Sequence, residues 1–279
     1  MRATCAADLS RRALLGGLLA APAVLKAAPA LVEAPAGRFR GTAEGGVRAF
    51  RGIRYGRAAR FRAPVAEPPT RGIQPADRFA PSAPQRGPIA PQSEDCLFLN
   101  IWTPAADGAR RPVLVYFHGG AYSTGTVAEP RVAGAALAAR DCVVVTVSHR
   151  LNALGYLALP GFPDAANAGQ LDLILALQWV QANIAAFGGD PANVTLFGQS
   201  GGGAKIITLM SMPAARGLFR RGWTMSGQQV TVQGPQNAAR RAQAYLAALG
   251  GDPLTLPVER LVAALDTVDP ILGGGLYFG

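Results

Sequence analysis

The sequence has few residues of the kinds that bind metals or form disulfides. Its 279 residues include only two histidines, His118 and His149, and three cysteines. No Cys/His spacing suits a metal site, and we expect neither a metal ion nor another cofactor. Charged residues make up 16% of the chain and apolar residues 49%, a balance typical of a globular protein rather than a disordered one.

Lysine is also scarce. Lys26 and Lys205 are the only lysines, so the net charge of +10, from 27 basic and 17 acidic residues, is due almost entirely to arginine. The arginines are scattered and form no dense basic stripe with interleaved aromatic residues. We therefore expect a solubilising surface and no nucleic-acid partner.

Residues 1–30 have the features of an export signal. A twin-arginine sequence, Ser-Arg-Arg-Ala-Leu-Leu at 10–15, overlaps a mildly apolar run over 13–25 that is too short to span a bilayer. We expect residues 1–30 to be a twin-arginine signal peptide, and residues 31–279 to form a mature chain without a membrane span. This predicts a periplasmic or secreted protein of a bacterium.

The cysteines favour free thiols over a disulfide. Cys5 lies in the predicted signal, so the mature chain keeps Cys96 and Cys142. Both lie in short apolar runs typical of strands. We therefore expect two buried free thiols.

Short apolar runs alternate with helical patterns through the middle of the chain. Strands are predicted at 97–102, 113–117, 143–147 and 194–197, and helices at 131–140, 170–187 and 204–210. This alternation predicts an α/β fold with a mostly parallel sheet covered by helices on both faces. Glycine-punctuated strands over 38–56 predict a small N-terminal antiparallel sheet, and the proline-rich residues 63–93 an ordered surface loop.

The clearest chemical motif lies between the strand at 194–197 and the helix that follows it. The sequence Gly-Gln-Ser-Gly-Gly at 198–202 contains Ser200. A G-x-S-x-G sequence between a strand and a helix is typical of a nucleophile elbow, a strained turn that lifts the serine hydroxyl out of the sheet. The pattern alone is weak in a chain with 34 glycines, so its strand–turn–helix context carries the prediction that Ser200 is a catalytic nucleophile.

A second motif lies upstream and complements the first. The strand at 113–117 runs into His-Gly-Gly-Ala at 118–121, a loop of the H-G-G-G type with alanine in the last place. Such a loop presents backbone N–H groups that form an oxyanion hole together with the N–H that follows a nucleophilic serine. The predicted donors are Gly120, Ala121 and Gly201.

These segments, with others in order along the chain, resemble the type B carboxylesterase family of the α/β-hydrolase fold. The matching segments are Ser-Glu-Asp-Cys-Leu-Phe-Leu-Asn-Ile-Trp at 93–102, the 118–121 loop, residues 148–156 and residues 167–203. The resemblance implies a serine hydrolase of small-molecule esters that forms an acyl-enzyme and uses a Ser, Glu and His triad. It also implies two buried structural ion pairs, Arg150 with Asp172 and Arg60 with Glu94.

Several positions depart from the family pattern. Gln199 stands where the family usually has glutamate, and Gly201 where it usually has alanine. Ala83 stands where many members have the cysteine that pairs with the Cys96 position, so that disulfide is absent. Aromatic features of the cholinesterase branch are also missing, which argues against choline esters.

The largest departure concerns the rest of the triad. In this fold the acid and the histidine follow the serine, but both histidines of this chain precede Ser200. We interpret His118 as structural and do not assign His149 as the base. The later acids, Asp252, Glu259, Asp266 and Asp269, all precede the strand expected to carry the triad acid. We therefore expect a C-terminally truncated chain that is inactive or very weak by itself and has an open sheet edge.

Two functional interpretations follow. The first is an ester hydrolase that acts through Ser200. The second is a non-catalytic binding or adhesion module, or an inactive fragment, that keeps the fold without the chemistry. The missing histidine favours the second, whereas both glycine motifs favour the first, because a binding module needs no oxyanion hole. Acyl and alcohol preference and the oligomeric state are left open.

Overall fold

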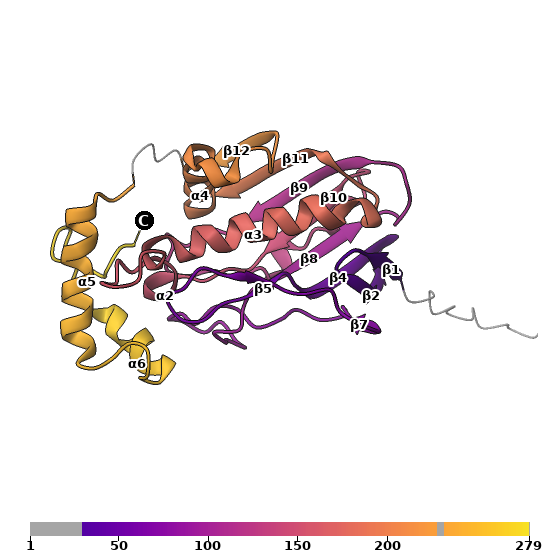
Figure 1. The fold of residues 1–279 in the computed structure, drawn as a ribbon. Helices are drawn as coiled ribbons and strands as arrows, with labels where there is room; N and C mark the ends of the chain where they lie inside the picture. Colours follow the sequence, from indigo (N-terminus) through magenta and orange to yellow (C-terminus); the bar gives the residue numbers. More distant parts are fainter. Residues whose placement is uncertain (1–29, 228–231, 279) are drawn as a thin grey trace, which may run out of the picture.

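The computed structural model describes residues 30–227 and 232–278. The predicted signal at 1–30 therefore lies outside the described residues, except for Ala30. A seven-stranded sheet forms the centre, in the order β12-β11-β9-β10-β8-β4-β3 (Figure 1). Its strands are β3 (Thr42–Glu44), β4 (Val47–Arg54), β8 (Phe98–Thr103), β9 (Arg111–Phe117), β10 (Val143–Val147), β11 (Gly189–Gln199) and β12 (Arg221–Met225).

The sheet is parallel where the predicted motifs lie. Strands β10, β9, β11 and β12 pair in parallel, whereas β8, β4 and β3 continue the sheet in antiparallel pairing. All four predicted strands are confirmed, and β11 is longer than expected. In β10 all five residues are buried, as a strand covered on both faces requires.

Helices cover both faces of the sheet. Val143, Val145 and Val147 of β10 share a core with α3 (Ala168–Asn183), which crosses the sheet in Figure 1. Between them Val144 points to the opposite face and packs with Trp102 and Ala138 of α1 (Ala135–Ala138). The helix α4 (Gly201–Ser211) packs on β11 and β12. The prediction of a sheet covered on both faces is confirmed.

Two of the predicted helices differ in detail. The helix expected at 131–140 is divided into a 3₁₀ turn, Pro130–Val132, and the short α1. Between them Gly134 lies so close to the sheet that a Cβ atom there would be 2.7 Å from the Trp102 ring. The helix expected at 170–187 is α3, followed by the 3₁₀ turn Ile184–Phe187.

A small N-terminal sheet with antiparallel pairing of β1 (Leu31–Ala34) and β2 (Gly37–Arg40) is present, as expected, and the strands of this region also form other pairings. β7 (Ile73–Pro75) completes this three-stranded sheet, and β5 (Gly56–Arg57) pairs with β6 (Val65–Ala66). However, β3 and β4, which also lie in the predicted region, join the large sheet. β4 does so because its apolar residues, among them Phe50 and Ile53, are buried against the core.

The region after β12 contains two helices that the sequence analysis missed. They are α5 (Pro235–Leu249) and α6 (Val258–Ala263). A third helix that was missed, the short α2 (Asn152–Tyr156), lies earlier in the chain, between β10 and α3. Further 3₁₀ turns lie at Ala165–Asn167, Pro213–Ala215 and Ala264–Asp266. Tyr245 of α5 and Leu261 of α6 share a second core with Tyr122 and Tyr156, which follow the ends of β9 and β10.

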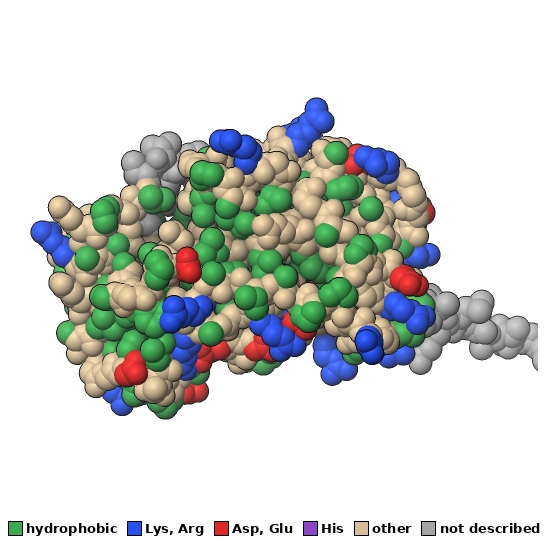
Figure 2. All heavy atoms as spheres, in the orientation of Figure 1, with side chains coloured by type: hydrophobic (Ala, Val, Ile, Leu, Met, Phe, Trp, Pro, Cys, Tyr) green, Lys and Arg blue, Asp and Glu red, His purple; other side chains and the backbone are tan. Residues whose placement is uncertain are grey.

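The cysteines, the last strand of the sheet and the surface charges were also the subject of predictions. Cys96 and Cys142 are buried free thiols, as predicted. Among the described residues β12 is the last strand of the large sheet, and Trp223 on it is 62% exposed. On the face shown in Figure 2, Lys and Arg side chains are dispersed among acidic and apolar ones. No helix in the described ranges has the length and apolar character needed to cross a bilayer.

Candidate active site

Ser200 occupies the sharp turn between β11 and α4. Its φ of 55° and ψ of −125° are strained values for a residue with a side chain. Its N–H donates to the carbonyl of Met225 on β12 at 2.8 Å, and its carbonyl accepts from the N–H of Ala204 at 3.0 Å. The neighbouring strand and the helix thus hold the strained residue from both sides.

The glycines on either side of Ser200 are required by close backbone contacts. A Cβ atom on Gly198 would lie 2.6 Å from the carbonyl carbon of Gly202. A Cβ atom on Gly202 would collide with the carbonyl of Phe117 at the end of β9. The G-x-S-x-G pattern therefore has a steric reason here.

The loop after β9 lies directly against this turn. Gly120, Ala121 and Tyr122 all have positive φ, at 93°, 51° and 63°. The Gly120 carbonyl accepts hydrogen bonds from two N–H groups of the following turn, at 2.9 and 3.0 Å. A Cβ atom on Gly201 would lie only 2.8 Å from the backbone nitrogen of Ala121. The structure therefore brings the predicted residues Ser200, Gly120, Ala121 and Gly201 together at one end of the sheet.

The same contact explains one departure from the family pattern. An alanine at position 201 would press its Cβ against the Ala121 nitrogen, so the loop could not keep its present position. Gly201 therefore suits the close approach of this loop. Among the described residues no acceptor takes the N–H groups of Gly120, Ala121 and Gly201, and backbone N–H groups of this kind can bind an anion.

Side chains from elsewhere in the chain hold the loop, and the sequence analysis missed them. The Gln85 amide bonds both sides of Gly125, with its Nε2 2.8 Å from the carbonyl and its Oε1 2.6 Å from the N–H. The Asn152 backbone N–H donates to the Tyr122 carbonyl at 2.7 Å. Its side-chain Nδ2 donates to the Ser123 carbonyl at 3.3 Å. No sequence motif marks Gln85 or Asn152, because their partners are distant in the chain.

The two histidines lie under this loop, with stacked rings. Their centroids are 4.6 Å apart, and His118 Nδ1 lies 2.8 Å from the Gly119 carbonyl. Burial, with the charge of Lys205, lowers the pKa of His118 to about 3 and that of His149 well below its ordinary value. Both rings are therefore neutral and weakly basic at pH 7. In the described part of the chain neither is hydrogen-bonded to Ser200.

Lys205 lies beside these rings and is fully buried. Its Nζ donates to the His118 carbonyl at 3.3 Å and lies 5.2 Å from the centre of the Tyr122 ring. Burial lowers its pKa to about 7. The sequence places this lysine in the helix after Ser200 but contains no indication that it is buried.

Two of the acids that follow Ser200, Asp266 and Asp269, have partners elsewhere. Asp269 binds Arg241, with Oδ2 2.5 Å from Nε, and this pair is buried. Asp269 also accepts the N–H groups of Ile271 and Leu272 at 2.8 and 3.0 Å. Asp266 forms an ion pair with Arg86. These contacts give Asp266 and Asp269 structural roles.

One predicted ion pair is buried, and the other is only partly so. Arg150 binds Asp172 through Nε and Nη2, at 2.9 and 2.6 Å, and both side chains are buried. Arg60 binds Glu94 at 2.7 and 2.6 Å, but the Glu94 side chain is 35% exposed. The first expectation is confirmed, and the second is corrected to a partly exposed pair.

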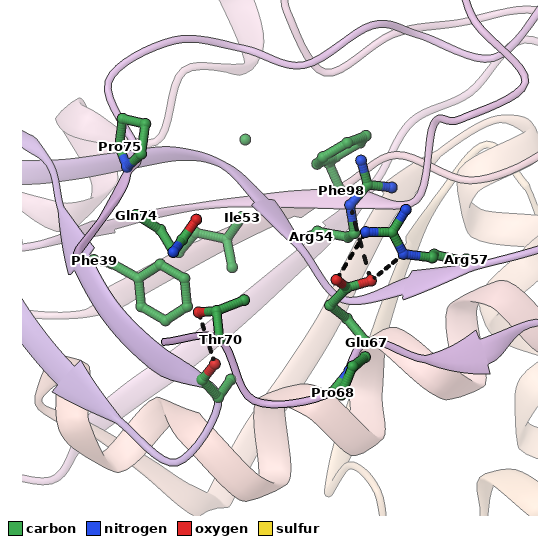
Figure 3. Close-up of a pocket in the computed structure, with 12 residues that line it drawn as sticks. Phe39, Ile53, Arg54, Arg57, Glu67, Pro68, Thr70, Gln74, Pro75 and Phe98 are labelled. Atoms are coloured by element: carbon green, nitrogen blue, oxygen red, sulfur yellow. Dashed lines mark hydrogen bonds and ion pairs between the residues drawn. The ribbon is translucent and has the colours of Figure 1, made fainter. Parts of the chain in front are cut away.

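Two cavities differ in their relation to the Ser200 turn. One, of about 550 Å³, lies between α3, α4 and the start of α5, and Tyr122 of the loop forms part of its wall. The other, of about 250 Å³, lies at the N-terminal strands (Figure 3). There Arg57 Nε is 2.7 Å from Glu67, and Arg54 also faces that carboxylate. No residue of the elbow or of the 118–122 loop lines this second cavity.

Within residues 30–227 and 232–278, no group of three or more His, Cys, Asp or Glu side chains could hold a metal ion.

Comparisons with known proteins agree on one family. The sequence model of the carboxylesterase family matches residues 28–255. The para-nitrobenzyl esterase of Bacillus subtilis (strain 168) is 40% identical over 253 residues, which cover 85% of this chain and 51% of that protein. The phenmedipham hydrolase of Pseudarthrobacter oxydans is 38% identical over 256 residues, with 83% and 51% covered.

Solved structures are similar to the same extent. A Geobacillus stearothermophilus carboxylesterase has a TM-score of 0.82 and 40% identity, with 88% of this chain and 55% of that chain covered. An esterase from Clostridium hathewayi that can hydrolyse aliphatic aromatic polyesters has a TM-score of 0.79 and 41% identity, with 90% of this chain and 56% of that chain covered. The chain thus spans about half the length of the relatives it matches.

Proposed function

The chain belongs to the carboxylesterase family and has the α/β-hydrolase fold, and from that premise we propose that Ser200 is the nucleophile of a carboxylic ester hydrolase. The observation that carries the proposal is the contact between the two glycine motifs. A strained serine lies at a helix N-terminus, and a loop whose Gly120 and Ala121 N–H groups have no acceptor among the described residues lies against that helix at Gly201. A purely structural turn has no need of this arrangement.

The reaction follows the usual course of acyl transfer. Ser200 Oγ attacks the ester carbonyl carbon and forms the acyl bond, while its proton passes to a general base. The carbonyl oxygen becomes an oxyanion, which accepts hydrogen bonds from the N–H groups of Gly120, Ala121 and Gly201. Collapse of this intermediate breaks the ester bond and releases the alcohol with a proton. Water then hydrolyses the acyl-enzyme and releases the carboxylic acid.

The general base is the part of this mechanism that His118 and His149 do not fit. Both are buried and neutral, and His118 has a pKa of about 3, far from the value near neutrality that suits a base. We propose that the triad glutamate and histidine come from a segment outside this sequence. By itself the chain should then retain only the weak catalysis of an oxyanion hole, roughly 10³–10⁴-fold over water.

We place the apolar part of the substrate in the cavity of about 550 Å³ behind Tyr122. Its volume lies within the range of about 300–1,000 Å³ that suits small ligands. Its wall includes apolar side chains such as Ile207 and Phe278, together with the hydroxyl of Thr208. A small-molecule ester with an apolar acyl or alcohol group fits this chemistry.

We further propose that residues 1–30 export the protein to the periplasm or the medium, and that residues 31–279 are the N-terminal portion of a carboxylesterase domain. The twin-arginine sequence supports export. Replacing Arg11 and Arg12 by lysine should then retain the protein in the cytoplasm of a host with this export route. Unchanged export of that variant would contradict the proposal.

A second candidate is a binding module that kept the fold without the chemistry. It is favoured by one observation, the absence of histidine after Ser200. The two candidates differ in whether the Ser200 hydroxyl is activated.

A fluorophosphonate probe separates them, because an oxyanion hole speeds its reaction with the serine even without the general base, whereas an ordinary hydroxyl does not react. We expect slow stoichiometric labelling of the chain that is abolished by Ser200→Ala and unchanged by Ser93→Ala, a serine outside the elbow. Labelling that survives Ser200→Ala would contradict the esterase proposal. The absence of any labelling, in this chain and in a longer one that includes the triad histidine, would favour the binding module.

A further inference from the structure

Lys205 is a buried cation with no counter-ion in the described part of the chain. It lies on α4, five residues after Ser200, and its exposed fraction is 0%. Among the described residues no carboxylate lies within 4.0 Å of its Nζ, and its one hydrogen bond there is to the His118 carbonyl. Buried ammonium groups are rare unless they are paired, because removal from water is costly.

The contacts of Lys205 bracket the predicted oxyanion loop. His118, whose carbonyl accepts from Nζ at 3.3 Å, directly precedes Gly119. Tyr122, whose ring centre is 5.2 Å from Nζ, directly follows Ala121. One side chain on the helix of the nucleophile thus contacts both ends of the loop.

The groups around Lys205 do not neutralise it. His118 and His149 face it from the ends of β9 and β10, and both have lowered pKa values, so they are uncharged at pH 7. Tyr122 faces it from the loop, and burial raises the pKa of that phenol to about 12. From α3, the Gln170 amide donates to the Lys205 carbonyl at 3.2 Å. Asp172, further along α3, is already bound to Arg150.

Stability alone does not account for a lysine here. Methionine has a similar length and would fill the site without the cost of a buried charge. A side chain that weakens the fold at such a place is expected where function depends on it.

We propose that Lys205 is a positioning residue, whose ammonium group fastens the 119–121 loop to α4 and keeps the Gly120 and Ala121 N–H groups directed at the Ser200 turn. The proposal rests on the esterase function proposed above. The protonated side chain attracts the His118 carbonyl and the face of the Tyr122 ring more strongly than the neutral amine does. Loss of the proton near neutral pH therefore loosens the loop.

Hydrogen exchange tests whether Lys205 holds the 119–121 loop in place, and it does not require an active enzyme. The informative amides are those of Ser123 and Thr124, which donate to Gly120, and that of Asn152, which donates to Tyr122. At pH 6, Lys205→Met should raise their exchange about tenfold relative to the wild-type chain, because the loop opens more often. Ile206→Met is the matched control, since Ile206 is buried on the same helix and lies against Gly222 on β12.

The pH dependence of exchange gives a second criterion. After correction for intrinsic exchange, the same amides of the wild-type chain should exchange faster at pH 8.5 than at pH 6. In Lys205→Met the corrected rates should not change with pH. Equal rates in the wild-type chain and in Lys205→Met at both pH values would overturn the proposal, and the wild-type series decides the question even if the variant fails to fold.

Fluorophosphonate labelling connects the loop to the chemistry. At pH 6 the wild-type chain should be labelled about ten times faster than Lys205→Met. At pH 9 the two labelling rates should become nearly equal. A ratio of the two rates that is constant with pH would contradict a positioning role that depends on charge. If the wild-type chain is never labelled, the labelling ratio is measured on a longer chain that includes the triad histidine, and hydrogen exchange decides the role of Lys205 in this chain.

Discussion

Two buried cations lie near the same end of the sheet and differ in how their charge is compensated. Arg150, just after β10, is held by Asp172 and also donates from Nη1 to the Arg62 carbonyl at 2.8 Å. Lys205, on α4, has a single hydrogen bond to a carbonyl among the described residues. The comparison indicates that Arg150, whose charge is paired with Asp172, stabilises the fold. Lys205, whose charge is not paired among the described residues, lies beside the site and can lose its proton near neutral pH.

The Arg150 region should give the largest effect. Asp172→Ala leaves the Arg150 guanidinium buried without its partner, and we expect the free energy of unfolding to fall by about 3–5 kcal/mol. Urea unfolding measures this. The matched double variant, Arg150→Met with Asp172→Leu, removes both charges and should recover most of the loss. If Asp172→Ala proved no worse than that double variant, the pair would not be structural.

The Lys205 region should respond in the opposite direction, with a pH dependence. The pKa of Lys205 is about 7 in the folded chain, below the ordinary value of 10.5, so the unfolded chain binds more protons between these pH values. Lys205 therefore destabilises the fold fully below pH 7, and this penalty disappears as the pH rises towards 10.5.

Lys205→Met should accordingly raise the free energy of unfolding by about 1–3 kcal/mol at pH 6. The gain should shrink steadily when urea unfolding is repeated at pH 8 and pH 10. A difference that does not change with pH, or a destabilised variant at pH 6, would show that the charge of Lys205 is compensated after all.

A third variant moves the loop without touching either cation. Gly201→Ala places a Cβ atom 2.8 Å from the Ala121 nitrogen, so the loop must shift. We expect a loss of about 1–2 kcal/mol in stability and a slower reaction of Ser200 with the fluorophosphonate probe. Adding Ala121→Gly should restore part of the stability and part of the labelling rate, because glycine adopts the positive φ of that position without strain. Unchanged labelling in Gly201→Ala would mean that the loop does not contribute to the reaction.

The smallest effect is expected at the partly exposed pair. Glu94→Gln removes the charge that faces Arg60, but Glu94 is 35% exposed and water screens the interaction. Arg60 also keeps its bonds to the Pro253 and Leu256 carbonyls, at 2.9 and 2.6 Å. We expect a loss of about 0.2–1 kcal/mol in urea unfolding. A loss as large as that of Asp172→Ala would contradict the distinction between buried and partly exposed pairs.

Much of the fold around the elbow could be predicted because its determinants are local. The apolar residues of 143–147 predict a buried strand by themselves, and β10 has those bounds. The glycines around Ser200 predict a tight turn between a strand and a helix, because only glycine fits where backbones approach so closely. The C-terminal helices were missed in a region without a recognised motif, although α5 begins at Pro235, directly after Gly234.

The sequence by itself therefore determined the order of the central strands with α3 and α4, the elbow and the loop type, since each depends on residues that are neighbours in the chain. Only the tertiary structure decided which polar groups are buried and which are paired. Lys205 and the His118 carbonyl are 87 residues apart, and Gln85 and Gly125 are 40 apart. Such contacts depend on how the sheet brings distant segments together, and no local pattern records which carbonyl or ring a side chain will meet.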